Sequence, residues 1–232
     1  MRSPGALIAS GRDSDIYEYG PGLVLRRARN GRSLETEART MDYVRSQGYP
    51  VPFVDEITEG GTALVMERII GPVMMKTLAQ RPWRMGTQAR LLAGLHTRLH
   101  EIDGPDWLGP APGPAGDRLL HLDLHPLNVI MAERGPVVID WPNARRGDPA
   151  VDVALTWVVL ESGAIPAPAP LAVLLGRFRS LFVRTFVAQF DRDAISAMVP
   201  AMVEYKVQDP HMSDVECQAM RRLSDAVSDG RR

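Results

Sequence analysis

The feature that most constrains the fold of this chain is a change of pattern at residues 71–72, a Gly-Pro pair. Before the pair, short apolar runs bounded by turn-forming residues predict strands. Only one segment there, residues 33–48, has apolar side chains at helical spacing, and Ser33 is its expected N-cap. The expected extended segments are residues 6–10, 15–20, 22–28, 49–58 and 60–69.

After residues 71–72 the chain is dominated by helical patterns. Residues 87–102 carry leucines at positions 91, 92, 95 and 99, which form one apolar face of a helix. Two short apolar runs on either side of an Arg-Gly turn predict a hairpin, at residues 129–131 and 137–139. Further helices are expected at residues 149–163, 171–190, 193–207 and 214–228. The sequence therefore predicts an α+β fold, with a small β-rich lobe over residues 1–69 and a larger, mainly helical lobe over residues 70–232.

Composition excludes several classes of protein. With a net charge of −1, binding to nucleic acid or to a membrane surface through bulk charge is not expected. Cys217 is the only cysteine, which excludes an internal disulfide and a cysteine-based zinc site. The N-terminal apolar run is too short for a signal peptide, and the apolar run at 153–160 is far shorter than a membrane span. We therefore expect a cytoplasmic protein.

The stretch HLDLHPLNVIM, residues 121–131, carries the chemistry, and it allows two interpretations. In an extended segment, His121, Asp123 and His125 would share one face and could bind zinc or iron. Pro126 bends the chain directly after His125, which disfavours this metal site. A metallohydrolase is therefore the weaker interpretation.

The second interpretation is phosphoryl transfer, which needs a carboxylate near the attacking hydroxyl and oxygen ligands for Mg²⁺. The spacing His-x-Asp-x-x-x-x-Asn supplies Asp123 and Asn128. Twelve residues after Asn128, the apolar run PVVID ends at Asp140. The expected hairpin would bring Asn128 and Asp140 to the same end, where one metal ion could bind both.

The segment from residue 121 to residue 152 resembles the aminoglycoside phosphotransferase-like family of small-molecule kinases, which has the bilobal protein-kinase-like fold. The family pattern is H-x-D-x-H-x-x-N followed by I-D-[W/F]-x-x-A-x-x-G-D-P-x-x-D. The matching positions here are His121, Asp123, His125, Asn128, Ile139, Asp140, Trp141, Ala144, Gly147, Asp148, Pro149 and Asp152. A chance match over so many ordered positions is very improbable.

The resemblance implies a role for each matching polar residue. Asp123 corresponds to the catalytic carboxylate that orients or deprotonates the substrate hydroxyl, and Asn128 and Asp140 correspond to the Mg²⁺ ligands. The resemblance also implies four supporting residues. His121 would brace the loop, His125 would be structural or lie near the phosphates, and Asp148 and Asp152 would be structural, with Asp148 capping a helix that begins with Pro149.

In the N-terminal lobe, the resemblance implies the parts of a nucleotide site. Arg26 takes the position at which the family usually has lysine, and Glu37 would be its partner on the helix. The loop at residues 9–17 would face the phosphates, with Ser10 and Gly11. The run TALVMERIIG resembles the hinge of the family. Met66 would then border the adenine pocket, and the base would pair with the backbone of Glu67 and Ile69.

The function implied is the transfer of the γ-phosphate of ATP or GTP, with Mg²⁺, to a hydroxyl of a small molecule, with an aminoglycoside or another antibiotic among the candidates. The alternative is a nucleotide-binding pseudokinase without turnover, which the arginine at position 26 and the glycine-poor loop would suit. A cationic acceptor would need a cluster of acids in the C-terminal lobe. The candidate acids there are Glu161, Asp191, Asp193, Glu204, Asp209, Asp214 and Glu216.

Overall fold

The computed structural model describes residues 3–11, 13–163 and 169–230. Contacts divide the chain into two compact units. Unit 1 comprises Met1–Val73 and Asn128–Ala144, and unit 2 comprises Met74–Leu127 and Arg145–Arg232. The contacts thus group the segment 128–144 with the N-terminal residues. The division into lobes at residues 1–69 and 70–232, which was predicted from the sequence, remains a prediction.

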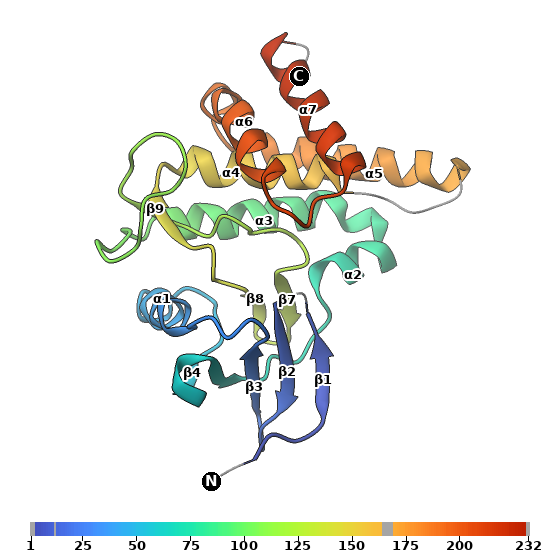
Figure 1. The fold of residues 1–232 in the computed structure, drawn as a ribbon. Helices are drawn as coiled ribbons and strands as arrows, with labels where there is room; N and C mark the ends of the chain where they lie inside the picture. Colours follow the sequence, from blue (N-terminus) through green and yellow to red (C-terminus); the bar gives the residue numbers. More distant parts are fainter. Residues whose placement is uncertain (1–2, 12, 164–168, 231–232) are drawn as a thin grey trace. The chain divides into compact units, whose positions relative to one another are not determined.

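Unit 1 is built on an antiparallel five-stranded sheet with the strand order β1-β2-β3-β5-β4 (Figure 1). One helix, α1 (Glu35–Ser46), lies beside this sheet, and a short 3₁₀ turn precedes β5. The strands are β1 (Leu7–Ser10), β2 (Ser14–Glu18), β3 (Leu23–Ala28), β4 (Val54–Thr58) and β5 (Ala63–Glu67). The strands and the helix that the sequence predicts for this region are therefore present.

Alternation along β5 explains how the sheet is buried on both faces. Leu64 packs with Leu34 and Ala38 at the α1 side, whereas Val65 packs with Leu25 on the opposite face. Successive side chains of a strand point to opposite faces, so β5 must be apolar at both positions. The central strands β3 and β5 are buried for this reason.

The start of α1 differs from the sequence prediction. The N-cap is Leu34, with φ −102° and ψ 7°, and no side chain caps it. Ser33 lies one residue earlier, where its hydroxyl oxygen accepts the N–H of Glu35 at 3.2 Å. The assignment of Ser33 as N-cap was therefore wrong by one residue, because the turn before the helix places Leu34 in the core.

The predicted hairpin is formed by β7 (Val129–Ala132) and β8 (Gly135–Val138). It is tied to the rest of unit 1 by two backbone hydrogen bonds, from Met131 N–H to the Pro72 carbonyl (2.8 Å) and from Val138 N–H to the Pro50 carbonyl (2.8 Å). The Trp141 ring meets the Tyr49 ring edge-on, with 5.7 Å between the centroids. These contacts explain why this distant segment belongs to unit 1.

Unit 2 is mainly helical. Helix α3 packs against α5, and α4 packs against α6 and α7 (Figure 1). The helices are α2 (Met74–Gln80), α3 (Met85–His100), α4 (Pro149–Ser162), α5 (Ala169–Val187), α6 (Arg192–Val207) and α7 (Asp214–Ser228). Helix α4 is buried on nearly every side, which its continuous apolar sequence predicts.

Among the described residues of unit 2, several short elements have no counterpart in the sequence prediction. They are α2, a 3₁₀ turn at Pro82–Arg84, and the paired strands β6 (Arg118–Leu120) and β9 (Arg145–Gly147). The two strands have three residues each and are too short to show a period, so only their pairing reveals them. In the part of the chain that the structure describes, no helix has the length and apolar character needed to cross a bilayer.

Candidate active site

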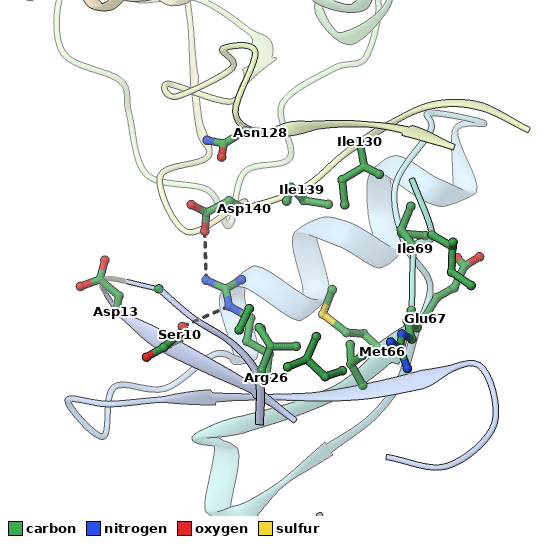
Figure 2. A pocket seen from close by; sticks show the side chains of 18 residues that line it. Ser10, Asp13, Arg26, Met66, Glu67, Ile69, Asn128, Ile130, Ile139 and Asp140 are labelled. Atoms are coloured by element: carbon green, nitrogen blue, oxygen red, sulfur yellow. Dashed lines mark hydrogen bonds and ion pairs between the residues drawn. The ribbon is translucent and has the colours of Figure 1, made fainter. Parts of the chain in front are cut away.

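Unit 1 contains a cavity of about 590 Å³, which falls in the range of small-molecule sites. Figure 2 shows that apolar side chains from the sheet, the hinge and the hairpin line one part of it, and that polar groups gather in the other part. The apolar lining includes Ile16, Val24, Met66, Ile130 and Ile139. The polar lining includes Ser10, Asp13, Arg26, Asn128 and Asp140. An apolar wall and a polar end suit a ligand that has an apolar part and a polar part.

Arg26 is the centre of the polar end. From β3 its guanidinium forms an ion pair with Glu37 of α1 and a second pair with Asp140, with 3.0 Å between Nη2 and Oδ1 (Figure 2). Its Nε also donates to the hydroxyl of Ser14 at 3.1 Å. Burial alone would lower the pKa of Arg26, but the charges of Glu37 and Asp140 raise it overall. The arginine therefore carries a permanent charge and joins three different segments.

We expect Arg26→Lys to lower the free energy of unfolding by about 1–3 kcal/mol, since a lysine ammonium cannot replace all three contacts and charged hydrogen bonds are lost in a buried place. Chemical denaturation would measure the change. Arg27→Lys is the matched control, because the adjacent Arg27 pairs with Glu59 at the surface. That variant should change the stability by less than about 0.5 kcal/mol. Equal losses in the two variants would contradict this account of Arg26.

Asn128 and Asp140 reach the same cavity because the β7–β8 hairpin joins them. Val129 pairs with Val138, and the N–H of Ile139 donates to the Asn128 carbonyl at 3.0 Å. Asp140 has a positive φ of 69°, a conformation that costs free energy in residues other than glycine and that is found at functional sites. An amide oxygen and a carboxylate are ligands that Mg²⁺ accepts, so the donor set fits this ion.

The hinge segment follows β5 along the apolar side of the cavity. The side chain of Glu67 points away into a bidentate pair with Arg134, and its backbone N–H donates to the Phe53 carbonyl at 2.9 Å. Within the described residues, no hydrogen bond engages the N–H of Ile69. A β-carbon at Gly71 would lie 2.4 Å from the Met131 carbonyl oxygen, so glycine is required where the hinge passes the hairpin.

The turn between β1 and β2 borders the polar end of the cavity. Ser10 donates its hydroxyl to the Asp15 carboxylate at 2.7 Å, and the N–H of Gly11 donates to the Ser14 carbonyl at 2.8 Å. Hydrogen bonds from Arg29 and Ser10 lower the pKa of Asp15 despite its small desolvation. Hydrogen bonds between neighbouring residues thus stabilise this turn. Ser10 and Gly11 both line the cavity.

In unit 2, the loop before Asn128 carries Asp123 beside His125. His125 Nδ1 accepts the N–H of Leu127 at 3.3 Å, so the proton of a neutral ring lies on Nε2, which is 3.5 Å from Asp123 Oδ1. Burial alone would raise the pKa of Asp123, but the hydrogen bond from His125, with the charge of Lys206, lowers it overall. Asp123 is therefore ionised at neutral pH and can accept a proton.

The pH at which kcat/KM falls on the acidic side should depend on the interaction of Asp123 with His125. In His125→Asn the effect of burial on Asp123 is less fully offset, so the pKa of Asp123 rises and activity should be lost at a higher pH than in the wild type. The measurement is kcat/KM as a function of pH. His211→Asn, at an exposed position of the α6–α7 connection, is the control and should leave this pH unchanged. An unchanged pH in His125→Asn would show that the imidazole does not act on Asp123.

Asp152, which is fully buried in the first turn of α4, holds the backbone of the same loop. Its Oδ1 accepts the N–H of Leu122 at 2.7 Å, and its Oδ2 accepts the N–H of His121 at 3.2 Å. Leu122 has a positive φ of 58°, so the residue directly before Asp123 is in the left-handed region. Asp148 caps α4 by accepting the N–H of Ala150 at 2.8 Å, and Pro149 occupies the first turn.

Comparisons with known proteins show what the chain resembles. Residues 110–190 match the model of the phosphotransferase enzyme family. Streptomycin 6-kinase of Streptomyces griseus is 27% identical over 142 residues, in an alignment that covers 45% of this chain and 44% of that enzyme. The resemblance to the aminoglycoside phosphotransferase-like family is confirmed. The matched stretch nevertheless spans less than half of the curated relative.

Solved structures confirm the protein-kinase-like fold. Aminoglycoside phosphotransferase APH(4)-Ia, in a ternary complex with AMP-PNP and hygromycin B, has a TM-score of 0.59 and 15% identity, covering 99% of this chain and 95% of that chain. ADP-bound APH(2'')-Ib has a TM-score of 0.60 and 13% identity, covering 94% and 90%. The predicted fold class is thus correct.

The residues that the family pattern selects fall into two groups. Unit 1 brings together the cofactor and metal candidates around one cavity, with Glu37 reaching it through Arg26, and these candidates are Ser10, Gly11, Arg26, Glu37, Met66, Glu67, Ile69, Asn128 and Asp140. Unit 2 holds the catalytic and supporting candidates His121, Asp123, His125, Asp148 and Asp152. Among the described residues, His121, Asp123 and His125 do not form a cluster that could hold a metal ion. This finding disfavours the metallohydrolase interpretation.

Sequence reasoning missed several side chains that this family-like site uses. Ser14, which the sequence places in the loop at residues 9–17, accepts a hydrogen bond from Arg26, a contact that the sequence does not indicate. Ile130 and the motif residue Ile139 line the cavity. Alternation in the two hairpin strands could have indicated that Ile130 and Ile139 share a face. The charge of Lys206, on α6, lowers the pKa of Asp123 although the two residues lie far apart in the sequence, and no local pattern indicates this interaction.

Three acids that were candidates for binding a cationic acceptor have structural roles. Asp191 caps α6, Asp209 pairs with Lys206 at 3.1 Å, and Glu216 forms a capping box with Ser213. A capping carboxylate that already accepts backbone N–H groups is a poorer partner for an acceptor's ammonium groups. The structure therefore gives these acids no clear role in acceptor binding.

Proposed function

We propose that this chain is a Mg²⁺-dependent phosphotransferase that moves the γ-phosphoryl group of ATP or GTP to a hydroxyl of a small molecule. The observation that carries the proposal is the convergence of Arg26, Asn128 and Asp140 on the polar end of a cavity that also has an apolar part (Figure 2). Matches to the phosphotransferase family and to structures with AMP-PNP and ADP support it.

Binding of the nucleotide follows from the lining of the cavity. The base would lie between apolar side chains such as Val24 and Ile139, beside Met66. The backbone carbonyl of Glu67 and the N–H of Ile69 would pair with the edge of the base. Arg26 and the turn at Ser10 and Gly11 would face the phosphates, because guanidinium groups and backbone N–H groups bind phosphate oxygens.

Asn128 and Asp140 would hold Mg²⁺ with their side-chain oxygens. When bound, the ion supplies positive charge to the phosphate oxygens as negative charge develops on them. The Asp140 carboxylate would then contact both the ion and the guanidinium of Arg26, with which it forms an ion pair in this structure. We expect nucleotide binding to weaken strongly when Mg²⁺ is removed with EDTA.

The transfer step uses Asp123. Its ionised carboxylate accepts the proton of the acceptor hydroxyl while the hydroxyl oxygen forms a bond to the γ-phosphorus. The bond between that phosphorus and the β–γ bridging oxygen breaks, and ADP or GDP leaves. The proton remains on Asp123 until it passes to solvent. The low pKa of Asp123 keeps the carboxylate ready for this step at neutral pH.

The acceptor class that we propose is an aminoglycoside or another hydroxylated antibiotic, because relatives in sequence and fold include a streptomycin kinase and a structure with hygromycin B. The test is a panel of hydroxylated acceptors with Mg²⁺ and radiolabelled ATP or GTP, read as label transferred to the acceptor. Transfer to any acceptor supports the proposal. Tight nucleotide binding without transfer or hydrolysis would instead identify a pseudokinase.

A further inference from the structure

The turn of the β7–β8 hairpin contains an arginine that the proposed mechanism does not use. Asn128 precedes β7 and Asp140 follows β8, so both lie at the open end of the hairpin. Arg134 lies at the other end, in the turn between the strands. Its two terminal nitrogens donate to the two carboxylate oxygens of Glu67, with 2.9 Å between Nη2 and Oε2. Arg134 therefore connects the turn of the hairpin to the hinge.

Glu67 is fixed by its backbone as well as by this ion pair. Its carboxylate also accepts the N–H of Phe53 at 3.3 Å, and its own N–H donates to the Phe53 carbonyl at 2.9 Å. The side chain of Glu67 is 17% exposed, whereas that of Arg134 is 52% exposed. Exposed ion pairs with loose geometry contribute little, but a bidentate pair of arginine and carboxylate fixes the orientation of both groups. The pair with Arg134 thus orients a residue that is already partly buried.

A second attachment joins the hairpin to the chain just after the hinge. The N–H of Met131 donates to the Pro72 carbonyl at 2.8 Å. Val73 and Ile130 form an antiparallel bridge beside this hydrogen bond. Gly71 passes close to the hairpin, because a β-carbon there would lie 2.4 Å from the Met131 carbonyl oxygen. This attachment is formed by backbone atoms.

The two attachments enclose a short segment, residues 68–71. Within the described residues, no hydrogen bond engages the N–H of Ile69, which lies in this segment. Under the proposed function, this N–H and the carbonyl of Glu67 pair with the base. Groups that are already held in place bind a ligand at a lower entropic cost than groups that must first be ordered. Arg134 restrains the start of the segment, and the backbone attachment restrains its end.

The same hairpin serves both sides of the cavity. Figure 2 shows Glu67 and Ile69 on one side of the cavity and Asn128 and Asp140 on the other. The pairing of the two strands is unbroken along the hairpin. A base bound at the hinge and phosphates bound near the metal candidates would therefore be located relative to the same two strands.

We propose that Arg134 is a positioning residue that holds Glu67, and with it the base-binding backbone of the hinge, in place for the nucleotide. Among the described residues that line the cavity, Arg134 is absent, so it acts through Glu67 and not by touching the base. This inference rests on the proposed function, because that function assigns the cavity to a nucleotide.

The first test compares a ligand that has a base with one that has none. In Arg134→Gln the dissociation constant for adenosine, or for guanosine if the wild-type protein prefers it, should rise about threefold to tenfold, because Glu67 loses its bidentate partner. The dissociation constant for tripolyphosphate with Mg²⁺ should change less than about twofold. Equilibrium dialysis of the full chain measures both. An unchanged constant for the nucleoside overturns the proposal, as does an equal weakening of both ligands.

Arg27→Gln is the matched control. Arg27 also forms a bidentate pair, with Glu59, in unit 1, and it is not among the described residues that line the cavity. This variant should leave both dissociation constants within about twofold of the wild-type values. A rise in the constant for the nucleoside as large as that in Arg134→Gln overturns the proposal, because it would show that the position of the arginine does not matter.

A double variant tests whether Arg134 acts through Glu67. Arg134→Gln and Glu67→Gln remove the same pair, so the two losses of nucleoside affinity should not add in the double variant. Losses that multiply overturn the proposal. Arg134→Lys keeps the charge but not the two parallel hydrogen bonds, so it should recover only part of the affinity. Full loss in Arg134→Lys supports the bidentate geometry equally, whereas full recovery shows that charge alone is sufficient and overturns the positioning role.

Failure of this inference is distinguishable from failure of the proposed function. In the transfer assay, Arg134→Gln should raise the KM for the nucleotide and leave kcat within about twofold, and an unchanged KM overturns only the role of Arg134. If the wild-type protein binds the nucleoside but transfers no phosphate, the phosphotransferase assignment fails and the binding measurements still decide the role of Arg134. If it binds neither nucleoside, both proposals fail.

Discussion

Asp123→Ala is expected to lower the rate of phosphoryl transfer by about 10²–10⁴-fold, because it removes the group that accepts the proton of the acceptor hydroxyl. The pKa of Asp123 is lowered, because the hydrogen bond from His125 and the charge of Lys206 outweigh the effect of burial. The measurement is kcat with saturating Mg²⁺ and nucleotide. Asp123→Asn, which keeps the size of the side chain, should be nearly as inactive.

Nucleotide binding supplies the control for Asp123. The cavity that would hold the nucleotide is lined by residues of unit 1, and Asp123 is not among them. The dissociation constant for a non-hydrolysable ATP analogue should therefore change by less than about threefold, below 1 kcal/mol of binding free energy. Unchanged turnover in Asp123→Ala would contradict the assignment of the catalytic residue.

Asp152→Ala should lower the free energy of unfolding by about 3–5 kcal/mol at neutral pH, because it leaves two backbone N–H groups and His100 without their buried acceptor. Denaturation in urea would measure this loss. The matched control is Asp148→Ala on the same helix, where the loss of an N-cap costs about 1 kcal/mol. A loss in Asp152→Ala no larger than that of the control would show that the buried network contributes little.

Acidification provides a second measurement on Asp152. Its folded pKa lies well below the ordinary value of 3.8, so the carboxylate's contribution to stability is fully present above that value. The contribution is lost as the pH falls from there towards the folded pKa. The wild-type protein should therefore lose stability below about pH 4 more steeply than Asp152→Ala does.

The fold of this chain was largely predictable from local patterns. Short apolar runs bounded by turn-forming residues predicted the strands of unit 1, helical spacing predicted α1 and α3, and longer helical patterns predicted the four later helices. The exceptions were elements such as β6 and β9, which have three residues each and exist only because they pair with one another. Local patterns contain no information about such pairing.

The candidate site was also predictable only in part. The order and spacing of Asp123, Asn128 and Asp140 identified the chemistry, because a hairpin between Asn128 and Asp140 is a local structure that the sequence determines. Helical spacing likewise places His96 on the buried face of α3 with Leu92 and Leu99. Spacing alone therefore determined which residues could carry the chemistry and which faces are buried.

The partners of those residues were decided only by the tertiary structure. Arg26 meets Asp140 across 114 positions of the chain, and His96 meets Leu124 and Thr156 from neighbouring elements. Periodicity reports which side of an element is buried but not which side chain lies opposite, because that depends on how helices and strands pack. The buried charges of this protein, and the support of its catalytic loop, are properties of that packing.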